Sequence, residues 1–188
     1  MKIQKAEMFN LKAASDKSKP DEILKILDIK SGQALADIGS GGGYFAMRFA
    51  EAVGRNGIVY AVDVNKEFLD YVMEESGKKK IENIKPVLSD GETAGLPEKG
   101  IDLVFMRNAY HHIPKRVDYF RRVAGALKGN GRIAIVERIK GGFSLRSLLG
   151  HFVDKKKIMS EMNDAGYDLA KEYDILARQS FMVFKPKK

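Results

Sequence analysis

The chain has 188 residues, of which 44% are hydrophobic and 31% charged, and it contains no cysteine. This length supports one core of ordinary domain size and is short for two. The lack of cysteine excludes disulfides, thiolate metal sites and cysteine nucleophiles. No apolar run is long enough to span a bilayer, and the first residues have no apolar core of signal-peptide length. We therefore expect a cytoplasmic protein that does not associate with membranes.

The formal net charge is +8, with basic clusters at residues 78–80, 155–157 and 185–188. A basic surface can bind nucleic acid or acidic substrates. These clusters are scattered and lack interleaved aromatic side chains, which favours a solvated lysine surface over a nucleic-acid interface.

Helix-like and strand-like patterns alternate from residue 20 onwards. Apolar spacing predicts helices that begin at Pro20-Asp21, run from 45 to 53 and from 68 to 77, and cover about 117–127 and 158–165. Strands are expected at 33–39, 57–64, 83–91, 100–108 and 132–138, with a glycine turn at 129–131. Two more strand-like segments, about 168–175 and 181–185, have no helix between them and should pair as an antiparallel hairpin.

This order predicts an α/β fold, a Rossmann-like doubly wound sheet of seven mostly parallel strands with a C-terminal antiparallel β-hairpin and helices on both faces. We expect a single domain over residues 1–188. Residues 20–188 would form its Rossmann-like core and residues 1–19 an N-terminal arm or lid. The arm and residues 140–152 show no clear pattern.

A glycine-rich loop, DIGSGGG at residues 37–43, ends the first expected strand and precedes a helix. In such sheets ligands bind at the carboxyl ends of the strands, where glycine allows close approach to the backbone. A P-loop needs Gly-Lys-Ser/Thr, whereas this chain has Gly43-Tyr44-Phe45. The dinucleotide pattern G-x-G-x-x-G matches only in part, because Tyr44 occupies its last glycine position. The pattern D-x-G-x-G-x-G matches fully.

Acidic residues follow the first three expected strands. Asp37 precedes the glycine loop, Asp63 lies 20 residues after Gly43, and Asp90 ends the third strand. Each alone can be a cap or turn residue. Their joint position at neighbouring strand ends indicates a binding site, because a carboxylate can accept hydrogen bonds from a ribose diol. Acids around the loop suit a cationic ligand rather than a phosphate.

These segments, together with LSDG, MRNAYHH and LKGNGRIAIVE, resemble the class I S-adenosylmethionine-dependent methyltransferases. The resemblance is greatest to the small stand-alone group that includes the ubiquinone/menaquinone-biosynthesis methyltransferases, and it covers roughly residues 21–185. It implies S-adenosylmethionine as cofactor and S-adenosylhomocysteine as product. Asp63 would hold the ribose, Val64 would pack on adenine, and Asp90 with the Gly91 N–H would bind the adenine edge. The full set of implied cofactor-binding residues is Asp37, Gly39, Ser40, Gly41, Gly43, Tyr44, Asp63, Val64, Ser89, Asp90, Gly91, Arg107 and Asn108.

Candidate catalytic residues follow the fourth strand and are His111, His112 and Asn108. In methyl transfer the protein mainly aligns the acceptor and can remove a proton, for which a histidine is suited. Alternatively, the two histidines open the helix near Pro114, with one ring packed and the other solvated. A metal site is not expected, since adjacent histidines diverge and His151 is the only other one.

A small molecule is the expected acceptor. The lack of cysteine argues against arsenite methylation, and residues 107–110 (RNAY) replace the N-P-P-Y/F motif of amino-group nucleic-acid methyltransferases. RNA or protein methylation, non-catalytic cofactor binding and NAD-dependent oxidation remain alternatives. The aromatic residues Phe9, Tyr110, Phe143 and Phe152 either line an apolar acceptor pocket or belong to the core. We expect a monomer or homodimer.

Overall fold

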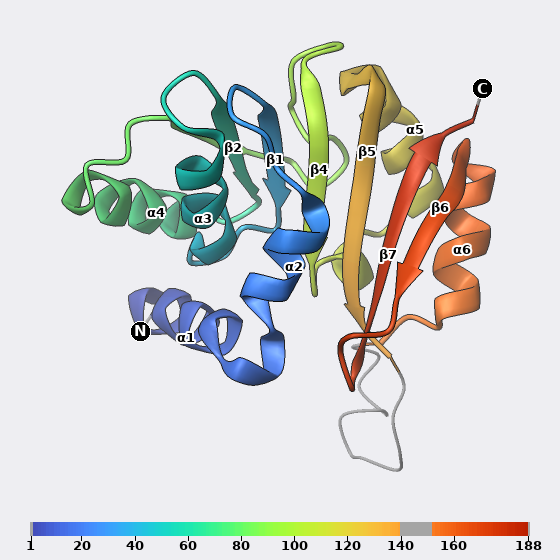
Figure 1. The fold of residues 1–188 in the computed structure, drawn as a ribbon, viewed down its shortest axis with the longest axis horizontal. Helices are drawn as coiled ribbons and strands as arrows, with labels where there is room; N and C mark the ends of the chain where they lie inside the picture. Colours follow the sequence, from blue (N-terminus) through green and yellow to red (C-terminus); the bar gives the residue numbers. More distant parts are fainter. Residues whose placement is uncertain (1, 140–151, 188) are drawn as a thin grey trace.

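The computed structural model describes residues 2–139 and 152–187, and seven strands in this part of the chain form one mixed sheet in the order β3-β2-β1-β4-β5-β7-β6 (Figure 1). Strands β1 to β5 pair in parallel, while β7 is antiparallel to both β5 and β6. The expected fold class is therefore confirmed. The strands are β1 Ala34–Ile38, β2 Ile58–Asp63, β3 Ile84–Leu88, β4 Ile101–Arg107, β5 Leu127–Arg138, β6 Tyr167–Tyr173 and β7 Gln179–Pro186.

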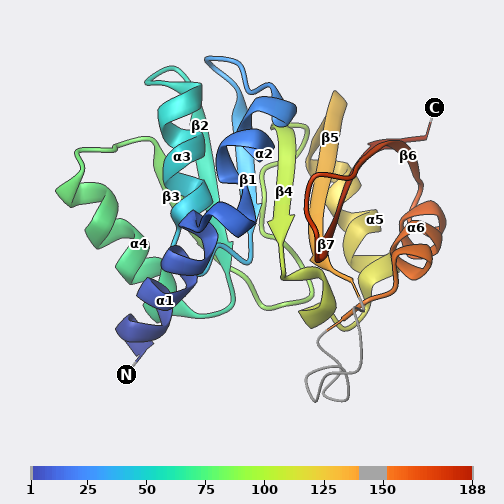
Figure 2. The same cartoon turned by 60° about the horizontal axis from the view of Figure 1, so that its bottom comes forward.

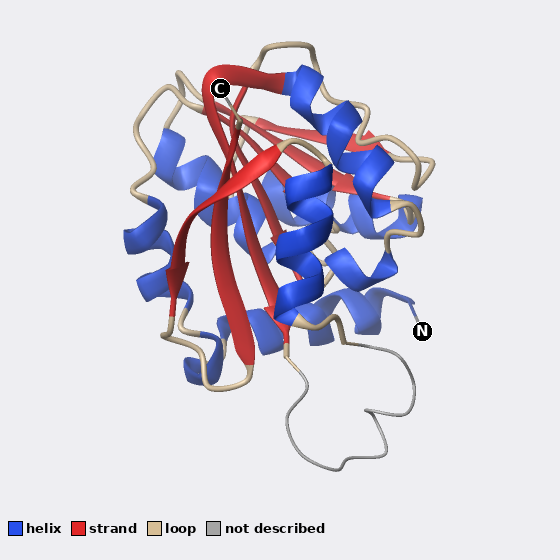
Figure 3. Ribbon diagram, turned by 90° about the vertical axis from the view of Figure 1, so that its right-hand side faces the viewer, coloured by secondary structure: helices blue, strands red, loops and turns tan. Residues whose placement is uncertain are grey.

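Helices cover both faces of the sheet (Figure 3). Because side chains alternate along a strand, neighbouring β1 residues point into different layers: Leu35 joins the cluster formed with α2, α3 and α4, and Ala36 joins the cluster formed with α5 and α6. Each layer is an apolar core of its own. The helices are α2 Pro20–Leu27, α3 Tyr44–Val53, α4 Lys66–Lys78, α5 Arg116–Ala126 and α6 Lys155–Asp164.

The fifth strand begins earlier than expected, at Leu127 rather than at 132. Ile101 pairs with Leu127 and Leu103 with Arg132, so a bulge in β5 accommodates the residues predicted as a turn. A Cβ on Gly131 would lie 2.9 Å from the Ile101 carbonyl oxygen. The glycines at 129 and 131 thus belong to a bulged strand that begins where the helix was expected to end.

The N-terminal arm is helical, with α1 spanning Lys2–Ala14 and the 3-10 helix η1 spanning Asp16–Ser18. Ala6 and Ala13 of α1 are buried, and the Phe9 ring lies edge-on to Phe68 of α4 at 5.7 Å. Figure 2 shows α1 beside α4, and Figure 1 shows it beyond the carboxyl ends of β1 and β4. The helical spacing of these three side chains is the signal that could have predicted α1; two of them are alanines, which makes it weak.

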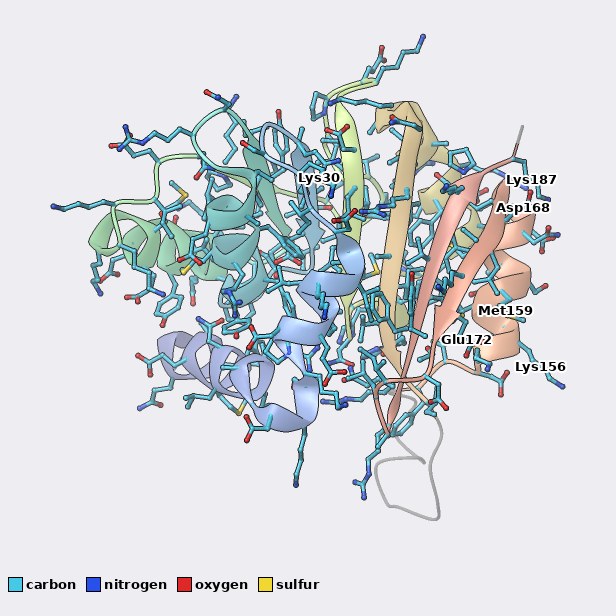
Figure 4. All side chains as sticks on the ribbon, in the orientation of Figure 1. Lys30, Lys156, Met159, Asp168, Glu172 and Lys187 are labelled. Carbon is cyan, nitrogen blue, oxygen red and sulfur yellow. The ribbon has the colours of Figure 1, made fainter. Side chains whose placement is uncertain are left out.

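Charged side chains occupy the exposed strand at the sheet edge. Figure 4 labels Asp168 and Glu172 on β6, and Lys155 of α6 forms an ion pair with Glu172 at 2.6 Å. Charges on an edge strand discourage pairing with another chain.

Within the described ranges, no helix has both the length and the apolar character needed to cross a bilayer.

Candidate functional site

The glycine loop connects β1 to α3 at the carboxyl end of the sheet. Gly39, Gly41 and Gly43 have φ values of +74°, +54° and +78°, in the left-handed region that favours glycine. A Cβ on Gly39 would also lie 2.4 Å from the Cβ of Ala109, which follows β4. The loop therefore needs glycine for its backbone conformation and for close contact with the β4 end.

Helix α1 binds the other side of this loop. Asn10 Nδ2 donates to the Gly42 carbonyl at 2.8 Å, and the Tyr44 N–H donates to Asn10 Oδ1 at 3.1 Å. A Cβ on Gly42 would lie 2.4 Å from the Ala6 carbonyl oxygen. The Tyr44 hydroxyl accepts from Arg48 Nη1 at 3.1 Å, so its polar end is engaged within α3. The N-terminal arm is thus docked against the backbone of the loop.

Asp63 joins the glycine loop to the end of β2. Its carboxylate is buried and accepts from the Gly41 N–H at 2.9 Å and from the Asn65 N–H at 2.9 Å. The apolar side chains of Val64 and Leu88 beside it are 65% and 59% exposed, which is unusual for such residues. A fixed carboxylate next to an exposed apolar surface suits a nucleoside, whose ribose is polar and whose base is flat.

The segment Ser89-Asp90-Gly91 forms a turn that its own side chains stabilise. Asp90 Oδ1 accepts from the backbone N–H groups of Glu92 and Thr93 at 2.9 and 2.8 Å, and the Gly91 N–H donates to Ser89 Oγ at 3.0 Å. The bonds from the Thr93 and Glu92 N–H groups keep the pKa of Asp90 below its usual value. Asp90 Oδ1 thus forms the hydrogen bonds expected of a turn residue. Its place beside Val64, whose Cγ1 would lie 3.7 Å from a Gly91 Cβ, is compatible with an adenine edge.

Asp37 is buried at the end of β1. Burial raises its pKa to about 7, and the charge of Asp63 adds to this, while the Ala46 N–H and the Arg107 guanidinium act in the opposite direction. A carboxyl group that titrates near neutral pH can become ionised when a cation such as an ammonium group is bound beside it.

Arg107 and Asn108 belong to one polar network at the end of β4. Arg107 Nη2 donates to Ser18 Oγ of η1 at 2.7 Å and contacts Gln179 Oε1 of β7 at 3.5 Å. Gln179 Nε2 in turn donates to Asn108 Oδ1 at 2.7 Å. Burial, followed by repulsion from Arg138, lowers the pKa of Arg107 to about 10. Ser18 and Gln179 were not predicted, because nothing in their own neighbourhoods marks them.

Two polar atoms at this edge are buried without a hydrogen-bond partner in the part of the chain that the structure describes, Ser40 Oγ and Arg107 Nε. Leaving such an atom unpaired costs about 1–3 kcal/mol. Together with Asp37 and Asp63 they give donors, acceptors and charges of both signs around the glycine loop. This set fits the ammonium, carboxylate and ribose groups of S-adenosylmethionine.

The candidate catalytic histidines lie in η2, which spans Tyr110–His112, and α5 begins only at Arg116. His111 Nδ1 lies 3.0 Å from Oε1 of Glu137, a fully buried residue of β5. The His111 side chain is 7% exposed, whereas His112 lies at the surface with its ring centroid 4.0 Å away. This burial agrees with the alternative of one packed and one solvated ring. Glu137, missed by the sequence prediction, stands out as an acidic residue within an apolar strand.

Tyr110 belongs to the core and does not line a pocket. It is fully buried, stacks on Phe120 with ring centroids 5.5 Å apart, and donates to Glu161 at 2.8 Å. Phe9 contacts the glycine loop, Phe152 is half-buried, and Phe143 lies outside the described residues. Across 2–139 and 152–187, no group of three or more His, Cys, Asp or Glu side chains is arranged to hold a metal ion.

Comparison with known proteins gives a family match over most of the chain. The model of a methyltransferase domain matches residues 29–177. A phosphoethanolamine N-methyltransferase 2 of Caenorhabditis elegans is 32% identical over 125 residues, which are 64% of this chain and 28% of the relative. A ubiquinone/menaquinone biosynthesis C-methyltransferase of Azotobacter vinelandii is 24% identical over 132 residues, 70% of this chain and 51% of the relative. The chain thus spans about half the length of these curated relatives or less.

The fold agrees with that of solved methyltransferases. The crystal structure of an S-adenosylmethionine-dependent methyltransferase from Aquifex aeolicus superposes with a TM-score of 0.79 at 21% identity, covering 88% of each chain. At this identity the match supports the fold alone.

Proposed function

Since the chain belongs to the class I S-adenosylmethionine-dependent methyltransferases, we propose that it transfers a methyl group from this cofactor to a small-molecule acceptor. The observation that carries the proposal is the hydrogen bond from the Gly41 N–H to the Asp63 carboxylate at 2.9 Å. This bond connects the ends of β1 and β2 beside the exposed side chain of Val64. This arrangement supports binding of a ribose and an adenine at this place.

The remaining site residues divide between the two ends of the cofactor. Asp63, Val64 and the turn at 89–91 lie at the ends of β2 and β3, on the adenosine side. Asp37, Arg107 at the end of β4 and the following Asn108 lie on the side of the methionine group. Gly39, Ser40, Gly41, Gly43 and Tyr44 form the floor between them. The orphaned Ser40 hydroxyl supports a polar ligand group at this place.

His111 is the better candidate of the two histidines for removing a proton from the acceptor. The cofactor supplies the methyl group already activated on a sulfonium sulfur. A neutral His111 that donates its Nδ1 hydrogen to Glu137 carries its lone pair on Nε2, the tautomer that a general base needs. His112 and Asn108 remain candidates for orienting the acceptor.

The acceptor class is supported by the names of the relatives, one a phosphoethanolamine N-methyltransferase and the other a C-methyltransferase of ubiquinone/menaquinone biosynthesis. The net charge of +8 keeps RNA or protein as the second candidate. The scattered basic clusters favour the small molecule. The cytoplasmic location, the single domain and the oligomeric state stay predictions.

Calorimetric titration with S-adenosylhomocysteine, NAD and ATP tests the cofactor. We expect S-adenosylhomocysteine to bind and Asp63→Asn to weaken it about tenfold or more, because a charge-assisted hydrogen bond is lost. Asp70→Asn, an exposed residue of α4 paired with Lys66, is the control and should leave the affinity unchanged. Binding of NAD alone would contradict the proposal. Transfer of labelled methyl groups to small molecules and to total RNA then separates the acceptor classes.

The catalytic assignment predicts different effects for the two histidines. His111→Gln and Glu137→Gln should each lower turnover about a hundredfold, the range of general acid–base catalysis, with S-adenosylhomocysteine affinity unchanged. His112→Gln, at a residue that would only orient the acceptor, should lower turnover less, and the exposed Asp70→Asn is the control that should leave turnover unchanged. Loss of cofactor binding in the His111 variant would exclude the catalytic role.

A further inference from the structure

Arg107 and Arg138 lie together at the ends of β4 and β5. Arg138 pairs with Gln179 of β7 in the antiparallel register, and Gln179 Oε1 is 3.5 Å from Arg107 Nη2. Arg138 is also the charged group that repels Arg107 most strongly. Two guanidinium groups thus share one edge of the sheet, on the side of the glycine loop opposite to β2 and β3.

Two other half-buried arginines have a carboxylate partner, whereas a third, Arg132, donates to the Leu27 carbonyl. Arg48 contacts Asp21 at 2.7 Å and Arg116 contacts Glu161 at 2.7 Å. By contrast, no Asp or Glu oxygen among the described residues lies within 4.0 Å of the guanidinium of Arg107.

The same holds for Arg138 throughout the described ranges, and the acids of this region are engaged elsewhere. Glu137 accepts from His111 Nδ1 and from the backbone N–H of Arg138. Asp37 acts on Arg107 through its charge but forms no ion pair with it. Among the described residues, the two guanidinium groups at this edge therefore form no direct ion pair, and Asp37 and Glu137 act on Arg107 only through their charges.

The Arg107 guanidinium is held in place by neutral groups. Its Nη2 donates to Ser18 Oγ, its Cζ lies 5.7 Å from the Phe45 ring centroid, and its Nε is buried with no hydrogen-bond partner among the described residues. An arginine fixed in this way loses little conformational freedom on binding and can offer a planar set of N–H donors to an oxyanion.

We propose that Arg107 and Arg138 bind the carboxylate or phosphate of an anionic methyl acceptor at the edge formed by β4, β5 and β7. This inference rests on the proposed function and names its acceptor class. The two arginines lie where an acceptor is expected. The adenosine side lies over β2 and β3, so an acceptor that meets the methyl group approaches from the side of β4 and β5. His111 and Glu137, at the ends of the same two strands, lie next to this edge.

The test uses inorganic phosphate, benzoate and the neutral analogue benzamide as probes, titrated into the protein saturated with S-adenosylhomocysteine. We expect phosphate and benzoate to bind and benzamide not to bind. Arg107→Gln and Arg138→Gln should each weaken both anions about tenfold or more. Arg55→Gln, an exposed arginine in the turn between α3 and β2, is the control of equal charge change and should have no effect. Anion binding that is absent, or equal in all four proteins, would overturn the inference.

A second arm distinguishes the acceptor from the carboxylate of the cofactor. If Arg107 instead binds the methionine carboxylate, Arg107→Gln should weaken S-adenosylhomocysteine about tenfold and leave 5′-methylthioadenosine, which lacks the amino-acid group, unchanged. That result would overturn the assignment to the acceptor. Circular dichroism checks the fold, and Arg138→Gln provides a second variant in which the bond to Ser18 is kept. Absence of S-adenosylhomocysteine binding to the wild type would contradict the proposed function itself, whereas its presence without anion binding contradicts this inference alone.

Discussion

Two arginines lie over aromatic rings on opposite faces of the sheet, and only one of them has a carboxylate. Arg116 of α5 lies 5.3 Å from the Tyr110 ring centroid and donates through Nε and Nη2 to both oxygens of Glu161. Arg107 of β4 lies 5.7 Å from the Phe45 ring and donates to a serine hydroxyl. The first network joins α5 to α6 and is complete, whereas in the second, Arg107 Nε has no hydrogen-bond partner within the part of the chain that the structure describes.

The direction of each pKa reflects this difference. Hydrogen bonds to Glu161 raise the pKa of Arg116, while burial lowers that of Arg107 to about 10. A desolvated guanidinium without a carboxylate opposes folding, and a paired one opposes it much less. Arg116 thus stabilises the packing of α5 against α6, whereas Arg107 lies where a ligand can supply the missing anion.

The largest expected loss of stability follows from breaking the complete network of Arg116 and Glu161. Glu161→Gln should lower the free energy of unfolding by about 2–3 kcal/mol, because it leaves the half-buried Arg116 without its carboxylate and weakens the bond from Tyr110. Urea denaturation at neutral pH measures this. The control is Glu172→Gln in the exposed pair with Lys155, with an expected loss of about 0–1 kcal/mol. Equal losses in the two variants would mean that the Arg116 network contributes no more than a surface pair.

The next effect concerns Asp37, the acid that acts on Arg107 without pairing with it. Its pKa in the folded protein, about 7, lies above the usual value. The folded state therefore binds more protons between about pH 4 and pH 7, and its stability falls as pH rises through this window. We expect the wild type to lose roughly 2 kcal/mol more than Asp37→Asn between pH 5 and pH 8, measured by urea denaturation.

Asp90→Asn serves as its control, since the pKa of Asp90 is lowered and its contribution is constant over this range. Parallel stability curves for wild type and Asp37→Asn would contradict the prediction. The affinity for the ligand should show the opposite pH dependence to the stability. The ionised Asp37 attracts an ammonium group, so S-adenosylhomocysteine affinity should rise from pH 6 to pH 8 in the wild type and stay level in Asp37→Asn.

The two arginine networks also show which features of the protein can be predicted from its sequence. The fold class follows from periodicity and strand order, and the glycine loop with Asp63 follows from residues that mark consecutive strand ends. The partners of Arg107 could not be predicted, since Ser18 and Gln179 are 89 and 72 residues away in the chain. The sequence around each of them contains no distinguishing pattern. Only the pairing of β5 with β7 and the docking of η1 bring them to β4. Local patterns indicate elements, while a polar network depends on their packing.

The smallest expected change in stability comes from Arg107 itself. Arg107→Gln loses the bond to Ser18, worth about 1 kcal/mol, and removes a desolvated charge that opposes folding by a similar amount. Ser18 Oγ still donates to the Lys12 carbonyl at 2.6 Å. The unfolding free energy in urea should therefore stay within about 1 kcal/mol of the wild type.

Arg116→Gln is the matched change in the complete network and should cost about 2 kcal/mol, because among the described residues Glu161 then keeps only Tyr110 and Lys157, the latter at 3.9 Å. With S-adenosylhomocysteine and benzoate present, the order should change. The wild type and Arg116→Gln gain stability from anion binding, whereas Arg107→Gln gains only from the cofactor product. A loss in Arg107→Gln as large as that in Arg116→Gln would make Arg107 a structural residue and remove the difference between the two networks.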